Sequence, residues 1–179
     1  KFGNRFINAG IAEQNMIGVA SGLALSGKVV FVYSITPFII FRPFEQIRLD
    51  LCSTKANVKL VGYGGGFTYG PLGVTHFAIE DISLMCSLPN MTVICPSDRT
   101  QAGILTQKIY EYAGPVYMRT GGGYAPVYEG EYPEIEIGKG IMLKDGKDIT
   151  LVSNGNILGE TMKVADILEK NNYNVMVID

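Results

Sequence analysis

The sequence has few of the residues from which metal centres are usually built. Its 179 residues include no tryptophan, three cysteines and a single histidine, His76. One imidazole excludes any site that needs two, such as an HExxH zinc site or a histidine triad. Cys52, Cys86 and Cys95 form no CxxC pair and stand among apolar residues. We therefore expect buried free thiols in a reducing, cytoplasmic setting, not a disulfide or a zinc site.

Strong charge and long apolar runs are also missing. Charged residues make up 18% of the chain, the net charge is −2 and the isoelectric point is about 5.5. No basic run predicts binding to nucleic acid or to a membrane surface. Every apolar stretch is interrupted within about ten residues, which is too short to span a bilayer. No signal peptide or transit segment is visible.

The elements that are present predict an α/β fold. Apolar runs rich in Val and Ile alternate with helical patterns, which is typical of βαβ units around a mainly parallel sheet. Strands are predicted at 28–34, 57–63, 92–95, 115–119, 148–153 and 174–178. Helices are predicted at 12–26, 38–54, 80–87, 98–112 and 157–171. Gly27 predicts a helix end, and Ser97 or Asp98 predicts an N-cap.

Composition divides the chain into three parts. Residues 1–120 are expected to form a first domain. Residues 121–147, rich in glycine and proline, are expected to be an ordered linker. Residues 148–179 then begin a second α/β domain with one strand, one helix and one strand. Three elements cannot close a core alone, so a continuation or a partner surface is implied.

The glycine-rich stretch 62–70 suggests a nucleotide-binding loop but lacks its chemistry. Gly65 and Gly70 have the spacing of a P-loop, yet Pro71 stands where the lysine is required. No GxGxxG opens a helix either. We expect a tight loop whose backbone lies close to a substrate or cofactor.

One carboxylate and three phenylalanines form the strongest candidate site. Glu13 opens an apolar helix, and Phe38, Phe41 and Phe44 follow about two dozen residues later. A carboxylate among apolar residues is costly to ionise, so it can hold or exchange a proton, and an aromatic wall suits a flat ring. An ordinary core stripe and a favourable helix dipole would give the same pattern. Pro43 suggests that the second helix begins near residue 40, with Phe38 on the entering loop.

The amino-acid sequences of several segments favour a cofactor site over an ordinary core stripe. Residues 6–16, FINAGIAEQNM, resemble the motif that opens the catalytic helix in the pyrimidine-binding domain of transketolases. The resemblance covers most of residues 5–121. It continues, in order, through 36–41, 74–81, 88–91 and 96–98. It implies a thiamin-diphosphate-binding, pyrimidine-type fold, with a mainly parallel sheet flanked by helices. Because such domains have a further strand and helix before this motif, and Lys1 is no initiator, we expect a segment of a longer polypeptide.

The resemblance also implies roles for individual residues. Glu13 corresponds to the glutamate that hydrogen-bonds the pyrimidine of thiamin diphosphate, so that the cofactor can cleave the bond beside a ketose carbonyl. Phe38, Phe41 and Phe44 correspond to the wall of the pyrimidine pocket, with Phe41 the best stacking candidate. His76 corresponds to a histidine that contacts substrate hydroxyls. The expected activity is transfer of a two-carbon ketol unit between sugars or sugar phosphates.

Departures from the family pattern bear on the substrate and the partner. Gly64 stands where the family has a loop histidine, and Leu72 stands where it has an acidic residue. The arginine that commonly binds the phosphate in the family corresponds to a position near Gly122. Arg119, three residues earlier, is the remaining candidate for the phosphate, so an unusual or less phosphorylated sugar is favoured. No Gly-Asp-Gly with a later Asn supplies Mg²⁺ and diphosphate. These ligands are expected on an upstream domain or another subunit of a homo- or hetero-oligomer.

Three alternative functions are also compatible with the sequence. A 1-deoxyxylulose-5-phosphate synthase would need a decarboxylating site, and its usual arginine after the first aromatic position is absent. The β-subunit of a 2-oxoacid dehydrogenase usually lacks the segment 10–15 in this form. A non-catalytic module that keeps the fold is favoured by the missing phosphate ligands, but disfavoured by Glu13 and the phenylalanines.

Overall fold

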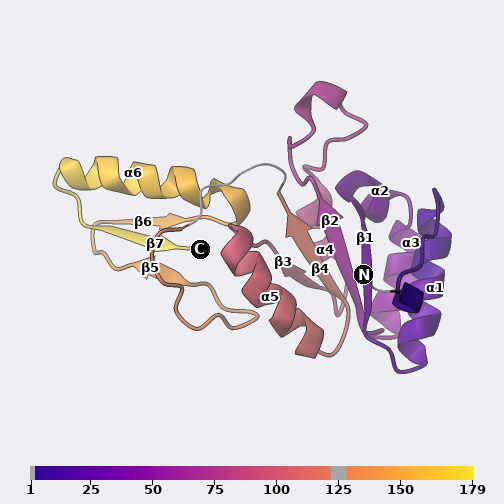
Figure 1. Ribbon diagram of the computed structural model, residues 1–179. Helices are drawn as coiled ribbons and strands as arrows, with labels where there is room; N and C mark the ends of the chain where they lie inside the picture. Colours follow the sequence, from indigo (N-terminus) through magenta and orange to yellow (C-terminus); the bar gives the residue numbers. More distant parts are fainter. Residues whose placement is uncertain (1–2, 122–127) are drawn as a thin grey trace.

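The computed structural model describes residues 3–121 and 128–179, which form two sheets (Figure 1). The first sheet is fully parallel, in the order β1-β2-β4-β3. Its strands are β1 (Val30–Ile35), β2 (Val58–Tyr63), β3 (Thr92–Ile94) and β4 (Val116–Thr120). The second sheet has the order β5-β7-β6. Its strands are β5 (Met142–Lys144), β6 (Ile149–Val152) and β7 (Val175–Ile178). We call residues 3–121, which contain the first sheet, the first unit, and residues 128–179, which contain the second sheet, the second unit. The predicted α/β class, with the start of a second α/β domain after the first, is confirmed.

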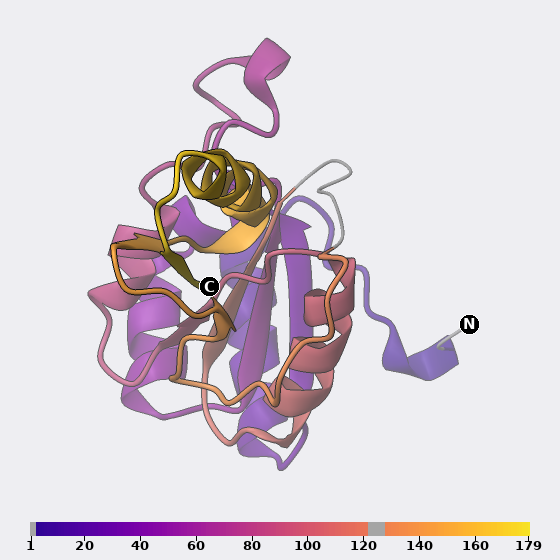
Figure 2. The same cartoon turned by 90° about the vertical axis from the view of Figure 1, so that its left-hand side faces the viewer.

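Helices lie against both sheets. The α-helices are α1 (Glu13–Leu25), α2 (Thr36–Phe41), α3 (Phe44–Gln46), α4 (Asp81–Cys86), α5 (Arg99–Glu111) and α6 (Leu158–Lys170). A π-helical segment, Ile47–Ser53, continues α3, and short 3-10 turns occupy Gly3–Arg5, Gly70–Leu72 and Gly155–Ile157. Figure 2 shows α6 over the second sheet and the segment after β2 projecting away from both. Within the described ranges, no helix combines the length and apolarity needed to cross a bilayer.

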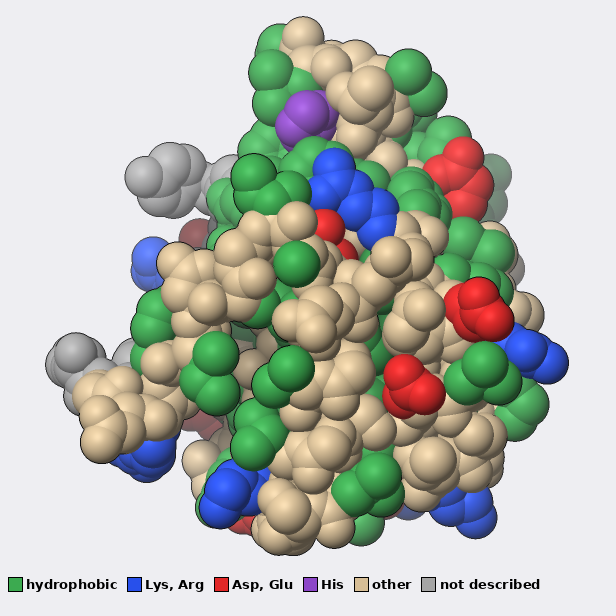
Figure 3. Space-filling model, turned by 90° about the vertical axis from the view of Figure 1, so that its right-hand side faces the viewer, with side chains coloured by type: hydrophobic (Ala, Val, Ile, Leu, Met, Phe, Trp, Pro, Cys, Tyr) green, Lys and Arg blue, Asp and Glu red, His purple; other side chains and the backbone are tan. Residues whose placement is uncertain are grey.

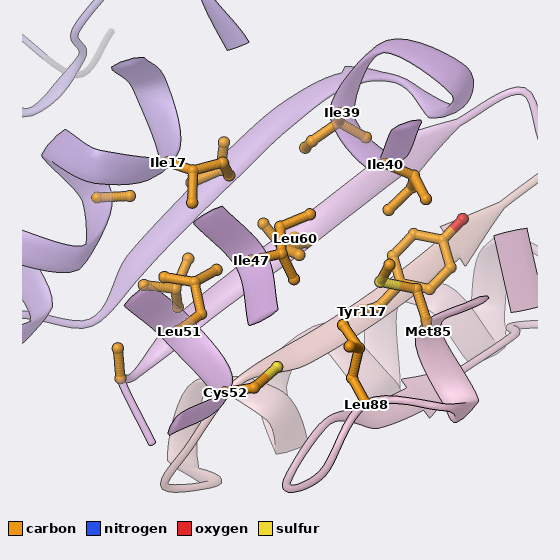
Figure 4. Close-up of a cluster of buried hydrophobic side chains, with 14 residues drawn as sticks. Ile17, Ile39, Ile40, Ile47, Leu51, Cys52, Leu60, Met85, Leu88 and Tyr117 are labelled. Atoms are coloured by element: carbon orange, nitrogen blue, oxygen red, sulfur yellow. The ribbon is translucent and has the colours of Figure 1, made fainter. Parts of the chain in front are cut away.

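Strand alternation gives the first sheet one buried cluster on each of its faces. Tyr117 points to the face covered by α1, α2, the π-helical segment and α4, where Ile17, Ile39 and Leu60 are buried (Figure 4). Its neighbours in β4 point to the opposite face, against α5. Successive side chains of a strand alternate between faces, so one short strand contributes to both layers. Helices on both faces are what a parallel sheet requires.

Four expectations need correction. The predicted helix 38–54 is interrupted at Pro43, which lacks an amide hydrogen, and Phe38 lies inside α2 and not on a loop. Residues 142–144, in the predicted linker, form β5 because they pair with β7. Cys86, expected to be buried, is exposed at the end of α4, whereas Cys52 is buried; all three cysteines are free.

Two carboxylates join the second unit to the first. Asp98 is the N-cap of α5 and accepts a hydrogen bond from the amide of Gln101 at 2.8 Å. Its other oxygen accepts bonds from the amide of Tyr128 and the hydroxyl of Tyr132. Asp179, after β7, accepts bonds from Ser97 and Gln101, and burial raises its pKa. The start of α5 is therefore the polar contact between the two units.

Lys59 is a fully buried cation at the second position of β2. Its ammonium donates to the carbonyls of Tyr112 at 2.7 Å and Gly114 at 2.6 Å, just after α5. Burial lowers the pKa of Lys59 from 10.5 to about 8. The side chain therefore satisfies two carbonyls at a helix end, where a cation is favourable, but at a cost in desolvation.

We expect Lys59→Met to lower the free energy of unfolding at pH 7 by about 1–3 kcal/mol, because two carbonyls lose their donor. Between pH values of about 8 and 10.5 the unfolded chain retains a proton that the buried amine has released. Stability contributed by Lys59 should therefore rise with pH in that window, and the gap between wild type and variant should widen. Urea unfolding of both proteins at pH 7 and pH 9 measures this gap. The control is Lys28→Met at an exposed lysine; an equal effect of the two substitutions would contradict the prediction.

Candidate functional site

The site lies where the parallel strands end. Ile35 and Tyr63 are the last residues of β1 and β2, and α2 and the glycine-rich loop follow them directly. In open parallel sheets, ligands bind beyond this carboxyl edge. The start of α1 completes the region, because its first residue, Glu13, pairs with Arg42 at the end of α2.

Glu13 is the first residue of α1, and its partner comes from another element. The Arg42 guanidinium donates to Oε1 of Glu13 at 2.8 Å, and the side chain of Glu13 is 11% exposed against 45% for Arg42. Gln14 donates to the backbone carbonyl of Arg42 at 3.3 Å, so both residues hold the segment after α2. The surroundings of Glu13 were predicted to be apolar. They contain a guanidinium, because the α2–α3 junction folds back over the start of α1.

Arg42 connects this carboxylate to an aromatic cluster. Its guanidinium carbon lies 4.1 Å from the ring centre of Phe38, within cation–π distance. The ring of Phe38 in turn meets that of His76 edge-on, with 5.3 Å between centres. Tyr69 flanks the histidine at 6.0 Å, and Thr75 hydrogen-bonds its Nδ1 at 2.9 Å. The fold therefore brings Glu13, Phe38 and His76 into one cluster from three separate segments.

The other two phenylalanines take different positions. Phe41 is 39% exposed, at the end of α2. Phe44 packs, partly buried, against the core cluster of the first sheet. The break at Pro43 turns α3 away from α2, which removes Phe44 from the register expected for one continuous helix. Of the predicted aromatic wall, only Phe38 is in the network of Arg42 and His76.

A surface opening of about 540 Å³ lies at the start of α1. Its walls are Arg42 and the segment 11–15, which includes Glu13. Figure 3 shows this side of the molecule, with the histidine above a basic and an acidic side chain. The opening has the volume of a small-molecule site and a carboxylate in its wall.

Arg119 has a buried partner. On β4, its Nε donates to Oδ2 of Asp81 at 2.8 Å, and its side chain is 14% exposed. Asp81 is fully buried at the start of α4, and the Tyr117 hydroxyl donates to the same oxygen at 2.6 Å. Burial, followed by the charge of Asp81, raises the pKa of Tyr117 strongly. The cation proposed for a phosphate is thus balanced by a carboxylate.

The glycine-rich loop is shaped by side chains of this chain. A Cβ at Gly65 would lie 2.5 Å from Nε of Arg119, and one at Gly64 would collide with the ring of Tyr69. Gly64 also has a φ of +85°, which favours glycine. The backbone was expected to lie close to a ligand. The neighbours that require glycine here are Arg119 and Tyr69.

Three positions, Gly64, Leu72 and Gly122, correspond to family residues near the substrate hydroxyls and phosphate, and the structure describes the first two. Gly64 has no room for a side chain, and Leu72 is 56% exposed. Gly122 lies outside the described residues. Among residues 3–121 and 128–179, no cluster of three His, Cys, Asp or Glu could hold a metal ion.

Sequence reasoning missed Arg42, Asp81 and Tyr69. The absence of an arginine directly after Phe38 was an argument against a 1-deoxyxylulose-5-phosphate synthase. In the structure, Arg42, one helical turn after Phe38, packs against the face of that ring. Its position four residues from Phe38 could have indicated this contact, because residues i and i+4 share a helix face. Nothing local could have indicated the Asp81–Arg119 pair, whose members are 38 residues apart.

Comparison with known proteins gives the family. Residues 1–123 match the description "Transketolase, pyrimidine binding domain", and residues 138–179 match "Transketolase, C-terminal domain". The chain is 41% identical to the putative transketolase C-terminal section of Methanocaldococcus jannaschii, over all of this chain and 57% of that protein. It is 36% identical to an apulose-4-phosphate transketolase subunit of Phocaeicola vulgatus, over 98% of this chain and 56% of that protein.

A solved structure of a split-gene transketolase, described as an inactive beta4 tetramer, matches with a TM-score of 0.89 and 39% identity. The match covers 99% of this chain and 57% of that one. The chain therefore spans a little over half the length of these relatives. Two matching domains that together cover most of the chain, at this identity, establish that the chain belongs to the transketolase family.

Proposed function

We propose that this chain supplies the pyrimidine half of a thiamin diphosphate site in an enzyme that transfers a two-carbon ketol unit between sugars or sugar phosphates. The observation that carries the proposal is the position of Glu13. Its carboxylate is mostly buried, lies in the wall of an opening and shares Arg42 with the ring of Phe38. A carboxylate beside an aromatic face suits a flat ring that must be protonated on one nitrogen.

The donor set fits this cofactor. Glu13 would hold the pyrimidine nitrogen, Phe38 and Phe41 would border the ring, and His76 would face substrate hydroxyls. When bound, thiamin diphosphate supplies a nucleophilic carbon that cleaves the bond beside a ketose carbonyl. Arg42 must share or release the carboxylate of Glu13 for a ring nitrogen to reach it. Because Arg42 is almost half exposed, the loss of that ion pair costs little, about 0–1 kcal/mol.

The other half of the site belongs to the proposal as well. The relatives are nearly twice as long as this chain, and some are subunits of split enzymes by name. We place the diphosphate and Mg²⁺ on an upstream domain or a partner subunit, within a cytoplasmic homo- or hetero-oligomer. Arg119 is the only family-predicted phosphate contact that the described residues retain, and its pairing with Asp81 favours weak discrimination between phosphorylated and free sugars.

Reconstitution tests the function. The complete protein, combined with its diphosphate-binding partner chain or domain, is assayed with thiamin diphosphate, Mg²⁺ and a ketose donor, against ribose 5-phosphate and ribose as acceptors. We expect ketol transfer to both acceptors. Decarboxylation of pyruvate in place of ketol transfer would favour a 1-deoxyxylulose-5-phosphate synthase. The contact of Arg42 with Phe38 is the reason to include pyruvate in the assay. Absence of cofactor binding by calorimetry would favour a non-catalytic module.

Phe41 tests the aromatic wall. Phe41→Ala should raise the Kd for thiamin diphosphate about tenfold, because a stacking contact of about 1.4 kcal/mol is lost. It should change the unfolding free energy little, because Phe41 is already 39% exposed. The control is Phe44→Ala, which removes core packing and should lower stability more than affinity. Calorimetric Kd and urea unfolding separate the two effects; an unchanged Kd in Phe41→Ala would exclude stacking.

A further inference from the structure

We propose that Arg119, paired with Asp81, is a positioning residue for His76, and that it acts by fixing both ends of the projecting segment 66–78. The kinetic part of this inference depends on the proposed function, whereas the structural part does not. The segment leaves the sheet after β2, returns to α4 and carries both His76 and Tyr69. Figure 1 shows the middle of this segment projecting beyond the end of the first sheet.

The first end of the segment rests on β4. The amides of Gly64 and Gly65 both donate to the carbonyl of Thr120, at 2.9 and 3.2 Å. The backbone of Gly65 also lies directly on the guanidinium of Arg119, since a Cβ there would approach Nε to 2.5 Å. Any side chain at Gly65 would therefore displace Arg119 or lift this end of the segment.

The second end rests on the same guanidinium. Nη2 of Arg119 reaches the carbonyl of Ala78 at 3.5 Å, and Nε binds Asp81, three residues later. Gly66 and Ala78 close the segment by exchanging two hydrogen bonds, at 2.8 and 3.0 Å. Arg119 therefore contacts the chain on both sides of this closure.

The segment has no charged anchor of its own. Residues 64–79 contain no Asp, Glu, Lys or Arg. The buried ion pair of Arg119 and Asp81 is the charged contact next to the ends of segment 66–78. The Tyr117 hydroxyl also donates a hydrogen bond to the Asp81 carboxylate and so helps to fix it. His76 lies two residues before Ala78 and meets Phe38 at 5.3 Å. A shift at Ala78 would move this imidazole relative to Phe38 and, through Arg42, to Glu13.

The same contacts argue against direct binding of a phosphate by Arg119. Its side chain is 14% exposed, and a fully buried carboxylate lies 2.8 Å from Nε. An opposite charge at that distance cancels most of the field that would attract a second anion. Arg119 then affects catalysis through the geometry of His76, not through the charge of the substrate.

Gly65→Ala tests the structural part without reference to activity. Its matched control is Gly103→Ala in α5, where a Cβ meets nothing within 4 Å. Protein labelled with ¹³C-histidine gives the His76 ring resonance, assigned by its loss in His76→Gln. We expect Gly65→Ala to shift this resonance, because the ring currents of Phe38 and Tyr69 act on it, and Gly103→Ala to leave it in place. An unshifted resonance in a folded Gly65→Ala protein would overturn the proposal.

A double-mutant cycle in the reconstituted holoenzyme tests the kinetic part. Gly65→Ala should lower kcat/KM about tenfold, yet in a His76→Ala background it should change kcat/KM less than about twofold, because both act through one group. Arg119→Met should alter the preference for ribose 5-phosphate over ribose less than about threefold. Additive effects in the cycle, or a loss of phosphate preference above about tenfold, would overturn the proposal. If the wild-type holoenzyme transfers no ketol unit, the proposed function fails, and the His76 resonance still decides the positioning role.

Discussion

Glu13→Gln should slow the exchange of the C2 proton of bound thiamin diphosphate by about 10²–10⁴-fold, because an amide cannot share a proton as a carboxyl group does. The fold should survive. The substitution removes the ion pair with Arg42, a partly exposed pair whose loss costs about 0–1 kcal/mol. Exchange is followed by quenched-flow labelling in deuterated buffer and ¹H NMR, with the holoenzyme saturated with cofactor.

Glu45→Gln is the matched control, because Glu45 is an exposed glutamate on α3, near Arg42 in the sequence. It should leave exchange unchanged. Arg42→Gln separates the two roles of Glu13, since it removes the ion pair but keeps the carboxylate. Exchange that remains at the wild-type rate in folded, cofactor-saturated Glu13→Gln would remove Glu13 from the catalytic site.

Asp81→Ala should lower the free energy of unfolding by about 3–5 kcal/mol, because it leaves the Arg119 guanidinium mostly buried without its counter-charge. Domains of this size are stable by about 5–15 kcal/mol, so the loss should be large in a urea titration. Glu80→Ala, at the exposed neighbour, should change stability by less than about 0.5 kcal/mol.

The double variant Asp81→Leu with Arg119→Met checks the cause of that loss. Removal of both charges eliminates the uncompensated cation, and the apolar side chains fill the space, so most of the stability should return. If the double variant is as unstable as Asp81→Ala, the loss comes from packing around α4 and not from the unpaired guanidinium.

Local patterns in the sequence anticipated most of the architecture. Runs of Val and Ile predicted six of the seven strands in residues 3–121 and 128–179. Gly27 after α1 and Asp98 before α5 indicated where these two helices end and begin. These signals are local because caps, helix ends and side-chain alternation depend on neighbours a few residues apart. β5 escaped prediction because its three residues form a strand only by pairing with β7.

The sequence by itself determined the family, the parallel sheet and the residues at the start of α1. Motifs and hydrophobic periodicity are properties of contiguous residues, so they can be recognised without the tertiary structure. Only the tertiary structure decided which of them meet. It placed Arg42 against Glu13, chose Phe38 from three phenylalanines for the contact with His76, and paired Arg119 with Asp81. These contacts join residues 29 to 38 positions apart. They depend on how α1, α2, α4 and β4 pack at one edge of the sheet, and no local pattern encodes a distance across that edge.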